Sequence, residues 1–85
     1  MPSIRVGSLR LTIYPNDHAP PHVHVIAPDW QLRIVFEGPV LEVQAGRPAG
    51  RDLRAALRAV NDHRVELELI WNKIHGHEDD QANES

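Results

Sequence analysis

The chain has 85 residues, so it can hold only one small domain, because a chain of this length buries little more than ~60% of the surface that its unfolded form exposes. Hydrophobic residues make up 41% and charged residues 25%, which is ordinary globular usage and excludes a wholly disordered or collagen-like chain. The sequence contains no cysteine, which excludes disulfides, thiolate metal sites and cysteine nucleophiles.

Charge and hydropathy also limit the location and the partners of the protein. The net charge of -3 argues against a protein that coats nucleic acid by bulk electrostatics. No apolar run reaches ~18 residues, and the N-terminus lacks the apolar stretch of a signal peptide. We therefore expect a cytoplasmic protein with no membrane contact.

The first half of the sequence alternates between apolar and polar residues, which is typical of half-buried β-strands. Such strands are expected over residues 8–14, 22–27, 31–37 and 40–44. The connections between them carry proline, glycine and aspartate and are short enough for hairpins. This pattern predicts an antiparallel β-meander of about four strands.

After the linker at 45–50, the apolar period changes from two to about 3.6, which predicts an amphipathic helix over 51–74. Asn61 and Asp62 are poor helix formers and good caps, so a break near them fits the pattern. The fold class is therefore α+β, with a long C-terminal helix packed on one face of the sheet. Residues 1–76 are expected to form the single domain, followed by an acidic disordered tail over 77–85.

Histidines concentrate around a stiff, proline-rich loop. His22 and His24 are two apart on a predicted strand, so their side chains project to the same side about 7 Å apart. His18 and Asp17 precede them on the loop, and His63 on the helix is a further candidate ligand. These five residues are the candidate ligands of a divalent metal, zinc or nickel.

The same residues also suit metal-free chemistry. Two histidines with pKa values near neutrality can serve as general base and general acid, and an arginine can stabilise a pentacoordinate phosphate. The candidate catalytic residues for such RNA cleavage are His18, His22, His24, Arg10 and Arg33. A third interpretation is that the prolines and histidines only build the hairpin. His75 and His77 are expected to be surface residues.

A basic ridge is expected on the first half of the helix, where Arg51, Arg54 and Arg58 lie three and four residues apart. It would fit a phosphate backbone or an acidic partner peptide, or it is simply a solvated face. Trp30 is expected on a turn beside Asp29 and is either an exposed aromatic anchor for a partner or a base, or a ring folded back on the sheet edge.

The loop and strand read Tyr14-x-x-Asp17-His18-x-Pro20-Pro21-His22-x-His24, and the helix reads His63-x-x-Glu66-Leu67-x-x-x-Trp71. This combination resembles the small bacterial family called domain of unknown function 4160 (DUF4160), over about Met1 to Ile74. The family often has an aromatic residue where this chain has Val23, and the acidic tail lies outside the resemblance.

The resemblance implies a component of a type II toxin–antitoxin-like module, on the toxin side. It also implies a small cognate protein partner of the antitoxin-like DUF2442 type. Action on RNA is one expectation, and a non-enzymatic metal-binding or protein-interaction module is the alternative. A homo-oligomer is left open.

Overall fold

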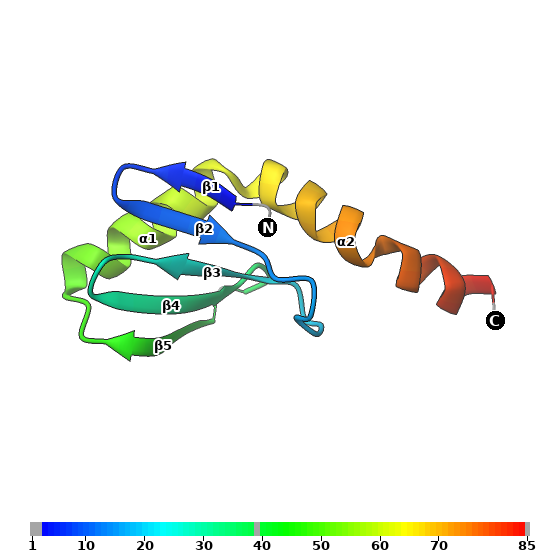
Figure 1. The fold of residues 1–85 in the computed structure, drawn as a ribbon, viewed down its shortest axis with the longest axis horizontal. Helices are drawn as coiled ribbons and strands as arrows, with labels where there is room; N and C mark the ends of the chain where they lie inside the picture. The colour runs from blue at the N-terminus through cyan, green and yellow to red at the C-terminus, as the bar shows by residue number, and fades with distance from the viewer. Residues whose placement is uncertain (1–2, 39, 85) are drawn as a thin grey trace.

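The computed structural model describes residues 3–38 and 40–84, and it describes side chains as far as His75. Five strands form one antiparallel sheet in chain order (Figure 1). They are β1 (Ser3–Val6), β2 (Leu9–Thr12), β3 (His22–Ile26), β4 (Trp30–Val35) and β5 (Leu41–Gly46). The predicted α+β meander is confirmed, with one strand more than expected.

The additional strand is β1, which pairs with β2 so that Ile4 lies opposite Leu11. Gly7 and Ser8 form the tight turn between the two strands, and Gly7 has a φ of 60°, which a residue without a Cβ adopts readily. Ile4 and Val6 pack against the core. Alternation in this strand is limited to Ile4 and Val6, whereas that around β2 extends over Leu9, Leu11 and Ile13.

One face of the sheet carries the core. Strand residues of alternating position are less than 2% exposed there, and they meet the buried side chains of the helices. The strand members of this set are Leu11, Val23, Val25, Leu32 and Ile34. Trp30 also belongs to the core at 7% exposure, because it begins β4 instead of standing on a turn. It is therefore folded back and is not an exposed anchor.

Two helices replace the single long helix expected, namely α1 (Gly50–Asp62) and α2 (Arg64–Glu84). The break falls at His63, directly after the Asn61–Asp62 pair that predicts it. At the start of α1 the Asp52 carboxylate accepts the backbone N–H of Ala49 at 2.8 Å, which satisfies one donor at the helix start. Ala56, Ala59 and Val60 of α1 are buried against the sheet.

Helix α2 buries Leu67 and Trp71 and then runs away from the sheet, as Figure 1 shows. The acidic tail expected over 77–85 stays a prediction, because the side chains from 76 onward lie outside the described residues. Among the described residues, no helix combines the length and the hydropathy needed to cross a membrane.

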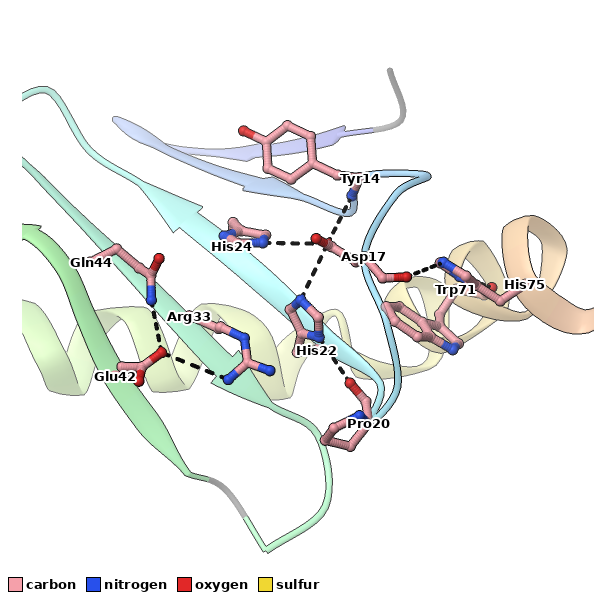
Figure 2. Close-up of polar contacts among 10 residues, drawn as sticks. All are labelled: Tyr14, Asp17, Pro20, His22, His24, Arg33, Glu42, Gln44, Trp71 and His75. Carbon is pink, nitrogen blue, oxygen red and sulfur yellow. Dashed lines mark hydrogen bonds and ion pairs between the residues drawn. The ribbon is translucent and has the colours of Figure 1, made fainter.

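The opposite face of the sheet carries polar residues. Cross-strand pairing places Thr12, His24, Arg33 and Glu42 in one row on β2 to β5. The loop between β2 and β3 lies beside this row and brings Asp17 close to His22 and His24 of β3 (Figure 2).

Candidate metal centre

Three side chains converge where the β2–β3 loop meets β3. Asp17 Oδ2 lies 3.2 Å from His22 Nε2 and 3.3 Å from His24 Nε2 (Figure 2). One ligand atom from each of the three residues lies within 4.8 Å of the other two. All three are well covered, since their side chains are only 16%, 4% and 16% exposed, respectively. The cluster therefore combines one carboxylate and two imidazoles in a site that is largely shielded from water.

The two histidines meet because strand geometry places them on one face. His24 pairs with Thr12 of β2 and with Arg33 of β4, while His22 pairs with Val35. Residues two apart on a strand project to the same side, and Val23 between them enters the core instead. Pairing on both sides of β3 fixes this register, so the imidazole positions are set by the sheet.

Asp17 is aimed at the histidines by a tight turn. Its backbone N–H donates to the Tyr14 carbonyl at 3.1 Å, and its carboxylate accepts the Tyr14 N–H at 3.2 Å. These two hydrogen bonds stabilise a tight turn over residues 14–17. The Ala19–Pro20 peptide bond that follows is cis.

The hydrogen bonding of His22 determines which ring nitrogen carries the proton in the neutral form. Its Nδ1 lies 2.8 Å from the Pro20 carbonyl oxygen, which only accepts, so Nδ1 must be the donor. Neutral His22 then presents a lone pair on Nε2, directly opposite the Asp17 carboxylate oxygen. Two facing acceptors at this distance require a cation between them, either a proton or a metal ion.

The surroundings of His24 disfavour its protonated form. Burial lowers the pKa of His24 below its ordinary value of 6.5, against the opposing effect of the Asp17 carboxylate, and His22 and Arg33 lower it further. Its Nε2 is buried, and its one close polar neighbour among the described residues is the Asp17 carboxylate oxygen at 3.3 Å. The neutral imidazole is the form in which histidine binds metals.

The two distances from the Asp17 carboxylate oxygen fit a tetrahedral ion. With Zn–N and Zn–O bonds of about 2.0–2.1 Å, the ligand atoms of a tetrahedral site lie about 3.3 Å apart. The observed separations from Asp17 Oδ2 are 3.2 and 3.3 Å. The Pro20 carbonyl is the kind of outer partner that fixes the tautomer of a metal-binding histidine. Three protein ligands would leave one coordination position for water or another donor.

Two aromatic side chains of α2 lie beside the candidate metal centre. Trp71 lies beside His22, with ring centroids 5.4 Å apart, and His75 stacks on Trp71 at 3.9 Å. His75 Nε2 lies 2.9 Å from the backbone carbonyl oxygen of Asp17. The expectation that His75 is a surface residue is wrong, because it is only 7% exposed. Its partner is 58 positions away, so no local pattern could have identified the contact.

The other histidines predicted as ligands lie outside the cluster. His18 is exposed and lines a hollow of about 470 Å³ together with Asp17, Trp71 and His75. His63 is half-buried between the two helices, where its Nδ1 lies 2.9 Å from Glu66 Oε1. The three-residue cluster therefore forms without either of them.

The predicted arginines lie on three different elements of the fold. Arg33 is the cross-strand neighbour of His24, and its Nη1 lies 3.8 Å from Glu42 Oε1. Arg10 is exposed on β2 opposite Ile26. The predicted basic ridge lies on α1, where Arg51, Arg54 and Arg58 are exposed.

Comparison with known proteins identifies one family. The profile of the family described as "Domain of unknown function (DUF4160)" matches residues 9–72, which include all three residues of the cluster. No curated protein and no solved structure matches the chain.

Proposed function

The chain belongs to the DUF4160 family, and we propose that it is a metal-binding interaction module in which Asp17, His22 and His24 hold one divalent ion, zinc or nickel. The observation that carries this proposal is the position of His22, whose Nε2 lies 3.2 Å from Asp17 Oδ2 while its Nδ1 lies 2.8 Å from the Pro20 carbonyl oxygen. The Nε2 of His24 is buried 3.3 Å from the same carboxylate oxygen and adds a second imidazole nitrogen as a candidate ligand.

A metal ion at this position would join the β2–β3 loop to the sheet. One ligand comes from the loop and two come from β3, so the ion would hold residues 13–21 against the strand. A ligand that binds only the folded state at 100 times its Kd stabilises that state by about 2.7 kcal/mol. The same loop lines the hollow beside His18, so the ion would also fix the shape of that surface.

The geometry supports metal binding better than acid–base cleavage of RNA. General base catalysis at a 2′-hydroxyl needs a ring nitrogen within hydrogen-bond reach of the substrate. His22 is 3% exposed, and its Nδ1 already donates to Pro20. The Nε2 of His24 is buried and lies 3.3 Å from the Asp17 carboxylate.

The place of the protein in a toxin–antitoxin-like module is a separate proposal. It is supported by the motif resemblance and by membership of the family, and it names a small DUF2442-type protein as the partner. Copurification of the untagged partner with this chain, after coexpression of the two, tests it. Separate elution of two folded proteins would contradict the proposal.

The metal proposal is tested by titrating zinc and then nickel into chelator-treated protein while following thermal unfolding. Asp17→Asn is the informative variant, because the amide oxygen can still accept the Tyr14 N–H while the charge is lost. We expect the melting temperature of wild-type protein to rise with metal, and that of Asp17→Asn to stay constant. His18→Gln, a histidine outside the cluster, is the matched control and should behave as wild type. An equal rise in Asp17→Asn would refute the proposed ligand set.

A further inference from the structure

A second concave surface shares no residue with the metal centre. It is a groove of about 550 Å³ between helix α1 and the turn that joins β1 to β2. Its lining includes Val6 and Leu9 on the strand side, and Arg51, Arg54, Arg58 and Asp62 on the helix side. We call it the arginine groove.

The arginine groove carries unneutralised positive charge. All three arginines are exposed, and their side chains form no ion pair or hydrogen bond with any side chain in the described ranges 3–38 and 40–75. Asp62 is the one acidic residue in the lining, so the formal charge of three arginines and one aspartate is +2. Elsewhere the chain is acidic enough to reach a net charge of -3. The groove therefore complements an anionic ligand.

The two walls of the groove differ in chemistry. Guanidinium groups on the helix wall suit carboxylates, which they bind through paired hydrogen bonds. Val6 and Leu9 on the opposite wall are half-buried and aliphatic. A ligand that satisfies both walls must present carboxylates on one side and apolar groups on the other. An extended peptide with alternating acidic and aliphatic residues does this, because successive side chains point to opposite sides.

The spacing of the arginines fits such a peptide. Arg54 and Arg58 are four residues apart on α1, a rise of about 6 Å at 1.5 Å per residue. Side chains at alternate positions of an extended chain are about 6.6 Å apart. Two carboxylates of an alternating peptide would therefore meet these two arginines in register. Arg51 lies three residues before Arg54, a rise of only about 4.5 Å, so it adds positive charge to the groove outside this register.

We propose that the arginine groove binds an extended acidic segment of a partner protein in which carboxylates alternate with aliphatic residues. This inference does not depend on the metal centre. A protein segment is favoured over single-stranded RNA because the lining contains no aromatic side chain on which a base could stack. A phosphate backbone would also offer no apolar group to pack against Val6 and Leu9.

The test is fluorescence anisotropy with a labelled peptide of six residues in which glutamate and leucine alternate. We expect saturable binding to the full-length protein, and a loss of at least about tenfold in affinity for the double variant Arg54→Glu/Arg58→Glu. Asp62→Asn should strengthen binding, because it removes the opposing carboxylate. The matched control Arg5→Glu/Arg10→Glu reverses two exposed arginines outside the groove and should bind as wild type.

Three outcomes would overturn the proposal. The first is equal binding of a peptide of the same composition with its glutamates and leucines in separate blocks, which would show attraction by charge alone. The second is tighter binding of a twelve-nucleotide oligouridylate through Arg54 and Arg58. The third is no peptide binding by wild-type protein. The neutral variant Arg54→Gln/Arg58→Gln, with an unchanged melting temperature, checks that any loss arises from the groove and not from misfolding.

Discussion

The ring of His75 lies with Nε2 2.9 Å from the backbone carbonyl oxygen of Asp17, although 58 positions separate the two residues in the sequence. The other ring nitrogen of His75 lies 3.1 Å from the carbonyl oxygen of Trp71, and the two rings stack. Helix α2 thus holds the backbone of Asp17 while the carboxylate of the same residue faces His22 and His24 (Figure 2).

This relationship predicts that His75 positions Asp17 for metal binding. His75→Ala would remove the contact with the Asp17 carbonyl, and loss of such an outer partner costs about 10- to 100-fold in metal affinity. Competition with a chromophoric zinc chelator measures this affinity. Lys73→Ala, an exposed change on the same helix, is the control. Equal zinc affinities of the His75 variant and wild type would show that the contact has no part in positioning Asp17.

The lowered pKa of His24 predicts how stability changes with pH in chelator-treated protein. In the unfolded chain, His24 regains its ordinary pKa of 6.5. At pH values between the lowered pKa and 6.5, the unfolded chain therefore binds more protons than the folded chain. The contribution of His24 is therefore fully present above pH 6.5 and is lost as the pH falls through the window below it.

Urea unfolding at about pH 7.5 and about pH 5.5 measures this effect as a difference in free energy of unfolding. The difference should be smaller in His24→Asn, which cannot take up the proton. His18→Asn is the control, because this histidine is exposed. If the free energy of unfolding of His24→Asn changed with pH as much as that of wild type, burial of His24 would not explain the loss of stability at low pH.

The packing of α2 can be tested by making the same leucine-to-alanine substitution at Leu67 and at Leu69. Leu67 is fully buried and Leu69 is 63% exposed. Leu67→Ala should lower the free energy of unfolding by about 2–5 kcal/mol, because it leaves a cavity. Leu69→Ala should change it by less than about 0.5 kcal/mol. Similar costs at the two positions would mean that α2 does not pack through Leu67.

Gly46 and Gly7 form a similar pair in the sheet. Both have positive φ, at 76° and 60°. A Cβ on Gly46 would overlap the Asp29 carbonyl oxygen and lie 2.8 Å from Trp30 Cα, whereas a Cβ on Gly7 would meet nothing within 4 Å. Gly7→Ala should therefore lower the free energy of unfolding by only about 1–2 kcal/mol, because alanine must adopt the left-handed conformation there. Gly46→Ala should cost clearly more in denaturant unfolding, and an equal cost would contradict the close approach of β5 to Trp30.

The fold was largely predictable because its signals are local. Alternation identified β2 to β5, and the change to a period of 3.6 identified the helical half together with its break beside Asn61 and Asp62. The missed strand β1 has the same alternation in Ile4 and Val6, but over too few residues to stand out. Pro28 and Asp29 predict that Trp30 lies on a turn, whereas pairing with Gly46 starts β4 at that residue.

The site was predictable only where strand geometry determines it. His22 and His24 had to share a face once they lay on one strand. The loop offered Asp17 and His18 as neighbours, and only the turn hydrogen bonds with Tyr14 select Asp17. His75 could not be found in this way, because its role depends on how α2 meets the loop.

The most direct test of the metal centre is elemental analysis of protein purified without a histidine tag or chelator, beside the double variant His22→Ala/His24→Ala. We expect near-stoichiometric zinc or nickel in the wild-type protein and none in the variant. Wild-type protein that stays metal-free even after incubation with zinc and nickel would contradict it.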